Sequence, residues 1–241
     1  MNINTTLVST LVSTQFPNFA NLPIQPFNSA GTDNAIFRLG NDMLVRLPLD
    51  SKSSGRVNKE YLWLPKLAPK LPLTIPTPIV KGMPTDDFPY NWSICQWIEG
   101  DTAILERIND PCKMAQKLAE FINVLQKITP PKELLSGQHN EFRGVSLSLL
   151  DKTVRNSITT LHGEIDTNLA MCVWESSIKV PVWQGDPVWL HGDLQSGNLI
   201  AKNGNLHAVI DFGLMGVGDP ACDIMVAWTL LPTESRKTVL H

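Results

Sequence analysis

Short apolar runs alternate with polar positions over the first hundred residues, a pattern typical of half-buried strands. Residues 35–39 and 43–47 read as two such strands, and Gly40-Asn41 between them is a signal for a tight hairpin. A third strand is predicted to begin at Trp92 and to leave into a loop by Gly100. The pattern therefore predicts an antiparallel sheet in this part of the chain.

Helical spacing interrupts this sheet. Val57, Leu64 and Leu67 recur at roughly the helical period, so a helix is predicted over residues 56–69, with Pro65 bending it or marking its end. The proline-rich segment that follows, up to about residue 80, reads as a connector. Residues 5–15 predict a further short helix.

The pattern changes to mainly helical beyond residue 100. Asp110-Pro111 is a helix start, with a capping side chain followed by proline at the first helical position. Residues 148–163 carry a weaker helical pattern, and Asp219-Pro220 opens a last helix through about Leu230. One apolar stripe follows the first of these starts and predicts a buried helix face: Met114, Leu118, Phe121, Ile122, Leu125 and Ile128.

Segregation of strands and helices along the chain predicts an α+β fold of two lobes. We expect an N-terminal lobe over residues 1–98, an antiparallel sheet with one helix, and a mainly helical C-terminal lobe over residues 99–241. The chain has 241 residues, of which 43% are hydrophobic, enough for a substantial core.

Apolar runs at residues 198–201 and 206–210 return to strands, and Asn203-Gly204 between them is among the strongest hairpin signals. With that turn Lys202 pairs with Asn205, and Asn198 falls opposite Val209. Asp211 then lies within a residue or two of Asn198 across the ladder.

Polar groups gather around this hairpin. Asp193 lies on the loop that enters the first strand, so its side chain and those of Asn198 and Asp211 can converge on one spot. Carboxylate and amide oxygens favour a hard cation, most naturally Mg²⁺ held together with substrate phosphates. A third carboxylate that is not used on metal can accept a proton from an alcohol, and together these are the parts required for phosphoryl transfer.

Bulk composition limits the classes of binding partner and the cellular compartment that the sequence predicts. The formal net charge of -3 offers no basic surplus that would predict binding of nucleic acid or of an anionic membrane. The apolar runs are far shorter than a membrane span, and the first residues lack the basic region of a signal peptide. Four dispersed cysteines form no CxxC pair and are expected to be buried free thiols, which predicts a cytoplasmic protein.

The stretch "HGDLQSGNLI", residues 191–200, resembles the HxDxxxxN catalytic loop of the aminoglycoside phosphotransferase and choline kinase-like family, relatives of protein kinases. "IDFG" at 210–213 is similar to the metal-binding motif of that family, and "GVGDPACDIMVAW" to the helix that follows it. The resemblance extends upstream through "GTDNAIFRLGNDMLVRLP" and implies a protein kinase-like fold. It also implies transfer of the γ-phosphate of ATP or GTP to a small-molecule hydroxyl, with an aminoglycoside-type antibiotic as the leading acceptor.

Residue roles follow from the resemblance alone. Asp193 would be the catalytic aspartate that orients the acceptor hydroxyl, and Asn198 and Asp211 would hold Mg²⁺. Asp223 would brace the catalytic loop through its backbone. His191 reads as a structural residue that bonds loop backbone rather than as a proton carrier.

The same resemblance assigns the nucleotide site. Arg46 would contact the α- and β-phosphates with Glu60 as its ion-pair partner. The loop over the phosphates would contain Gly31, Thr32 and Asn34. The adenine-binding hinge would be formed by Gln96 to Ile98.

Departures from the family pattern keep alternatives open. Arginine stands at position 46, where kinase relatives usually have lysine, the phosphate loop lacks GxGxxG, and the chain is short at its C-terminus. One alternative is therefore a nucleotide-binding pseudoenzyme with an incomplete acceptor site. Another is a metal-dependent phosphoesterase built on His191, Asp193 and Asp211, although the other histidines are scattered. Considered singly, Asp193 and Asn198 could be turn formers, Gly31 a turn glycine, and Arg46–Glu60 a solvated pair.

Overall fold

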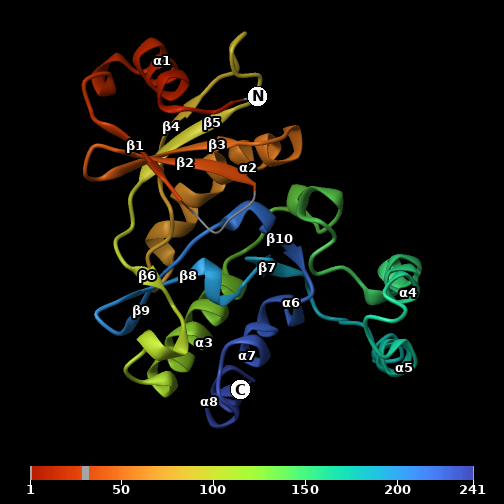
Figure 1. Ribbon diagram of the computed structural model, residues 1–241. Helices are drawn as coiled ribbons and strands as arrows, with labels where there is room; N and C mark the ends of the chain where they lie inside the picture. Colours follow the sequence, from red (N-terminus) through yellow and green to blue (C-terminus); the bar gives the residue numbers. More distant parts are fainter. Residues whose placement is uncertain (1, 29–32, 241) are drawn as a thin grey trace.

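The computed structural model describes residues 2–28 and 33–240, and its elements form two lobes (Figure 1). The upper lobe carries a five-stranded antiparallel sheet in the order β1-β2-β3-β5-β4. Its elements are α1 (Thr5–Gln15), β1 (Ile24–Phe27), β2 (Asn34–Leu39), β3 (Met43–Pro48), α2 (Ser51–Leu67), β4 (Pro78–Gly82) and β5 (Trp92–Gln96). The predicted segregation into a sheet lobe and a helical lobe is confirmed.

The lower lobe is mainly helical and also holds two small sheets, β10-β7 and β6-β8-β9. Helices α4 and α5 stand apart from the rest of this lobe in Figure 1. Its elements are β6 (Asp101–Thr102), α3 (Pro111–Lys127), α4 (Asp151–Thr160), α5 (Thr167–Ser177), β7 (Val188–Leu190), β8 (Leu199–Lys202), β9 (Asn205–Val209), β10 (Gly216–Gly218), α6 (Ala221–Ile224), α7 (Val226–Thr229) and α8 (Thr233–Leu240).

Each lobe has its own apolar core. In the upper lobe, Val8, Leu11 and Val12 of α1 pack with inward residues of the sheet. In the lower lobe, the predicted stripe on α3 is buried from Met114 to Leu125, and Ile128 packs partly buried beside it. Trp63 on α2 stacks edge-on against Trp189 of β7, with ring centroids 5.3 Å apart, and so joins α2 to the lower lobe. This contact ties the helix that carries Glu60 to the strand that leads into residues 191–198.

Helix α2 begins earlier than the predicted residue 56. The side chain of Asp50 caps it by accepting a hydrogen bond from the Ser53 amide at 2.7 Å, and this satisfies one of the unpaired amides of the first turn. Pro65 lies inside the last turn without ending the helix. The earlier start matters because it adds Lys52, which contacts Glu141 of the lower lobe, to the helix.

The β8–β9 hairpin has the predicted turn, and Asn203 and Gly204 both adopt positive φ angles, 52° and 73°. Lys202 pairs with Asn205 as expected. A bulge between Ile200 and Ala201 then shifts the register, so Val209 lies opposite Leu199 and the predicted pairing with Asn198 is wrong by one residue. Asn198 still adjoins the end of β9, because its carbonyl accepts the Ile210 amide at 2.8 Å.

Several other expectations need correction. The connector before β5 contains the strand β4, and the last predicted helix is broken into α6 and α7 and followed by α8. Cys112 and Cys172 are exposed rather than buried, although all four thiols are free. Within residues 2–28 and 33–240, no helix is long and apolar enough to cross a membrane.

Candidate active site

The catalytic-loop motif joins β7 to β8 at the junction of the two lobes. Gly192 has φ +83°, a region that side chains disfavour, and an added Cβ would lie 2.3 Å from the Leu214 carbonyl oxygen. The His191 ring is fully buried; its Nδ1 accepts the Asp193 amide, and its Nε2 lies 3.0 Å from the Ile210 carbonyl oxygen. The histidine therefore ties the loop to the segment after β9 that carries Asp211, as expected of a structural residue.

Asp223 braces the same loop from below. Its fully buried carboxylate accepts the His191 amide at 2.7 Å and the Gly192 amide at 2.8 Å. Burial raises the pKa of this carboxyl, and the two amide hydrogen bonds, which favour the charged form, oppose that shift. Both oxygens are thus committed to holding the backbone on which Asp193 sits.

Asp223→Asn tests this brace. An asparagine keeps only one acceptor oxygen, so one of the two loop amides loses its partner inside the protein. We expect a loss of about 1–3 kcal/mol in unfolding free energy and a lower kcat, because an unsatisfied buried donor costs its desolvation. Chemical denaturation and turnover measured on the same variant check this, and an unaltered unfolding free energy would show that the brace is dispensable.

The Asp193 carboxylate is held on one side by amides. Its Oδ2 accepts from Asn198 Nδ2 at 3.0 Å and from Gln195 Nε2 at 3.1 Å. Its Oδ1 lies 3.9 Å from Nη2 of Arg143, a residue that sequence reasoning did not single out. Because Oδ2 is occupied, Oδ1 is the oxygen that can meet an acceptor hydroxyl.

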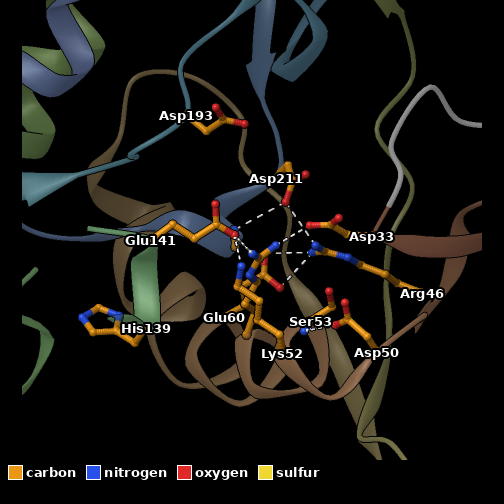
Figure 2. Close-up of polar contacts among 12 residues, drawn as sticks. Asp33, Arg46, Asp50, Lys52, Ser53, Glu60, His139, Glu141, Asp193 and Asp211 are labelled. Atoms are coloured by element: carbon orange, nitrogen blue, oxygen red, sulfur yellow. Dashed lines mark hydrogen bonds and ion pairs between the residues drawn. The ribbon is translucent and has the colours of Figure 1, made fainter. Parts of the chain in front are cut away.

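Arg46 links the two lobes, as Figure 2 shows. Its Nη1 lies 2.8 Å from both Glu60 oxygens, and its Nη2 lies 3.1 Å from Asp211 Oδ1. Glu60 is almost completely buried, so this pair is not the solvated surface contact considered as an alternative. The predicted ion pair exists, and it also reaches the aspartate of the IDFG motif.

Electrostatics at Asp211 favour the charged form. Burial is the largest single effect and raises the pKa of its carboxyl, but the Arg46 guanidinium, His191, the Gly213 amide and Arg56 together outweigh it, so the net pKa is lowered. The residue also has a left-handed backbone, with φ 61° and ψ 70°, which is uncommon outside glycine and clusters at functional sites. Asp211 therefore presents an ionised carboxylate from a constrained turn.

The residues present fit a magnesium ion. The hydrogen bonds that position Asn198 use its amide nitrogen, and its oxygen can therefore serve a cation. Asp211 bonds Arg46 and the Gly213 amide through Oδ1, and its side chain is partly exposed, so the carboxylate can reach a cation as well. In the described part of the chain no group of three or more His, Cys, Asp or Glu side chains could hold a metal. Two protein oxygens suit Mg²⁺ that takes its other ligands from phosphate and water.

The remaining predicted nucleotide residues are only partly brought together. Gly31 and Thr32 lie outside the described residues. Asn34 opens β2, where its buried side-chain oxygen has no hydrogen-bond partner among residues 2–28 and 33–240. Gln96 ends β5 and Ile98 follows it in the segment between the lobes, and the amide of Gln96 donates to the Thr77 carbonyl.

An arginine on α2 was missed by sequence reasoning. Arg56 is buried, bonds Asp33 beside the predicted phosphate loop, and lies 2.6 Å from Glu141 in the lower lobe. Lys52 also lies 2.6 Å from Glu141 (Figure 2). No local pattern predicts these contacts, since the partners are far apart in sequence. The Asp50 cap was the available signal that α2 begins early enough to include Lys52.

A hollow of about 340 Å³ lies beside the loop that carries Arg143. Gly144, which follows Arg143, lines it, and Asp219 contributes a carboxylate. The lining is otherwise mostly apolar and includes Leu135, Val145, Leu149, Val182, Trp183 and Val217. Because the hollow adjoins the loop of Arg143, which contacts Asp193, it is a candidate site for an acceptor molecule.

Solved structures resemble this chain over nearly its whole length. The GDP complex of wild-type aminoglycoside 2'-phosphotransferase-IIIa matches with a TM-score of 0.81 and 21% identity, covering 99% of this chain and 82% of the other. The streptomycin–ATP ternary complex of APH(2″)-IIa gives 0.66 and 20%, covering 100% and 82%. The macrolide 2'-phosphotransferase MphH from Brachybacterium faecium gives 0.67 and 19%, covering 97% and 80%.

Sequence comparisons complete this result. Among curated proteins, no sequence matches this one. The family model described as "Phosphotransferase enzyme family" matches residues 24–241, which include the sheet of the upper lobe, the lower lobe and every residue of the candidate site. The chain therefore belongs to the phosphotransferase enzyme family, and its fold is protein kinase-like.

Proposed function

We propose that this phosphotransferase moves the γ-phosphoryl group of a Mg²⁺-bound nucleoside triphosphate to a hydroxyl of a small molecule. The observation that carries the proposal is the link from Glu60 through Arg46 to Asp211, which lies beside the loop of Asp193. It gathers a cation for phosphates, a carboxylate for metal and a base for an alcohol at one lobe junction.

In the proposed reaction the acceptor hydroxyl donates its proton to Asp193 Oδ1. Its oxygen forms a bond to the γ-phosphorus, and the bond from that phosphorus to the β–γ bridging oxygen breaks, so the nucleoside diphosphate leaves with the electron pair. Asn198 and Asp211 would hold Mg²⁺, which when bound offsets the charge of the phosphates. Arg46 would contact the phosphates.

The proposed acceptor and nucleotide follow from the ligands and activities named for the similar solved structures. Their complexes contain GDP or ATP, and they include aminoglycoside and macrolide enzymes. We propose a hydroxylated antibiotic-type acceptor, and the hollow beside Arg143 supports a molecule with a substantial apolar face.

A transfer assay tests the proposal. Purified chain with Mg²⁺ and γ-labelled ATP or GTP is incubated with a panel of aminoglycosides, macrolides and other alcohols. We expect one acceptor class to gain label and the mass of one phosphoryl group. Nucleotide binding without any labelled product across the panel would favour the pseudoenzyme, and phosphate release from a monoester without nucleotide would favour the phosphoesterase.

Arg46→Ala is expected to raise the nucleotide KM about 10- to 100-fold, the effect of losing a charge-assisted hydrogen bond. It also strands the buried Glu60 carboxylate, and breaking a buried pair in this way costs about 3–5 kcal/mol of stability. The double variant with Glu60→Gln recovers part of that stability but keeps the high KM. If KM instead returns with stability, Arg46 acts on the fold and not on the phosphates.

A further inference from the structure

We infer that Arg143 orients the acceptor hydroxyl, which hydrogen-bonds both Arg143 and Asp193. This inference rests on the proposed function and concerns a residue outside both sequence motifs. Arg143 Nη2 lies 3.9 Å from Asp193 Oδ1, and both side chains remain partly open, with 39% and 27% of their area exposed. The separation exceeds a hydrogen bond, so the two groups face each other without closing the gap.

A hydroxyl oxygen fits this gap. A polar contact longer than about 3.5 Å invites a bridging group that hydrogen-bonds both sides. The guanidinium can only donate and the ionised carboxylate can only accept, whereas a hydroxyl does both. An acceptor hydroxyl that accepts from Arg143 and donates to Asp193 Oδ1 therefore has its proton aimed at the base and one remaining lone pair for the γ-phosphorus.

The hydrogen bonds of the Asp193 carboxylate leave one of its oxygens open for this arrangement. Asn198 and Gln195 both bond Oδ2, and this leaves Oδ1 turned toward Arg143. Among the residues that the structure describes, Arg143 is the cation in ion-pair contact with Asp193. An arginine that only stabilised the surface would not need the opposite oxygen to be held by two amides.

Hydrogen bonds also hold the backbone of the loop that carries Arg143. Fully buried Asn140 spans the loop, since its Oδ1 accepts the Gly137 amide at 2.9 Å and its Nδ2 donates to the Arg143 carbonyl at 3.0 Å. Glu141 and Phe142 both have positive φ, 55° and 60°, and consecutive non-glycine residues in that region are strained. A half-exposed ion pair offsets little of such strain, so stability alone does not account for this loop.

The same loop is tied to the nucleotide side. Glu141 lies 2.6 Å from Arg56 and from Lys52 on α2, and Arg56 bonds Asp33 beside the phosphate loop. In Figure 2 Glu141 points into this network while Asp193 stands outside it. Two residues further along the chain, Arg143 reaches that outlying carboxylate, so one short loop positions its cation relative to both substrates.

The position of the hollow agrees with this role. Gly144 and Val145, directly after Arg143, line it, and the Gly144 carbonyl accepts the Asp219 amide at 2.9 Å. A molecule seated there would lie against the residues that directly follow Arg143 in the chain. The acceptor is thus recognised at its reacting group by one donor and one acceptor, whatever the remainder of the molecule is.

Arg143→Ala, Arg143→Lys and the remote control Arg236→Ala, on α8, test the inference. With the acceptor identified by the transfer assay, we expect Arg143→Ala to lower kcat for transfer about 10- to 100-fold through misorientation. The nucleotide KM and the melting temperature should stay at wild-type values. Hydrolysis of the same nucleotide by water should fall less than transfer, so the ratio of transfer to hydrolysis drops. The lysine variant and added guanidinium should each restore part of the transfer.

Contrary results distinguish a failure of the Arg143 inference from a failure of the proposed function. If the wild type transfers phosphate and Arg143→Ala does so at the same rate, the inference is wrong and the proposed function stands. A fall in transfer, hydrolysis and melting temperature together, with no rescue by guanidinium, assigns Arg143 a structural role and also overturns it. If the wild type transfers to no acceptor, the proposed function fails and the inference falls with it.

Discussion

Asp193→Ala lowers the kcat for phosphoryl transfer about 10²- to 10⁴-fold, the usual contribution of a positioned general base. The physical reason is that Oδ1 is the proton acceptor and Oδ2 is already occupied by Asn198 and Gln195. Nucleotide affinity stays nearly unchanged, because the Arg46, Glu60 and Asp211 contacts do not involve Asp193 and Asn198 keeps its hydrogen bond to the backbone carbonyl of residue 193.

Two measurements check this expectation: initial rates at saturating substrates and the dissociation constant of the Mg²⁺-nucleotide. Exposed Asp86, in the upper lobe, supplies the matched control as Asp86→Ala. Asp193→Asn keeps the shape of the side chain and removes its charge, so it should resemble the alanine variant in rate. Wild-type turnover in either Asp193 variant would refute its role as the base.

Asp211→Ala weakens binding of the Mg²⁺-nucleotide itself, and we expect the dissociation constant to rise on the order of a hundredfold because a carboxylate ligand of the metal is lost. The chain should also lose turnover, since the metal offsets charge on the transferring phosphoryl group. This differs in kind from Asp193→Ala, which leaves binding intact.

Measuring affinity with Mg²⁺ and again with chelator isolates the metal contribution. In chelator, the variant should bind nucleotide as well as the wild type or better, because Arg46 is released from its 3.1 Å contact with Asp211. Asp211→Asn controls for the left-handed backbone, which asparagine tolerates better than alanine. An equal loss of affinity with and without metal would count against metal binding by Asp211.

Local signals predicted the elements that carry the chemistry. Asn203-Gly204 predicted its hairpin because both residues accept positive φ, and Asp110-Pro111 predicted the start of α3. The register error at Asn198 has a physical cause, since the extra residue of the bulge, His207 in β9, depends on how the hairpin packs and has no sequence marker of its own.

Long-range contacts account for what the sequence did not predict. Strand β1 contains Pro26 and β4 begins at Pro78; both lie at the edges of the sheet, where proline is tolerated, and so their sequences read as loop. The contacts of Arg56 with Glu141 and of Arg143 with Asp193 join residues 85 and 50 positions apart. The first pair follows from the packing of α2 against the lower lobe and the second from packing within the lower lobe, and no motif marks either. Asp223 could be anticipated only through the family resemblance.

The most direct test is a crystal structure of the chain with Mg²⁺ and a non-hydrolysable nucleoside triphosphate. The account predicts a cation about 2.1 Å from the Asn198 side-chain oxygen and from the Asp211 carboxylate, with the phosphates completing its shell. It also predicts Arg46 on the phosphates and Asp193 off the metal, facing the γ-phosphorus. A metal bound away from Asn198 and Asp211, or triphosphate bound outside the lobe junction, would contradict it.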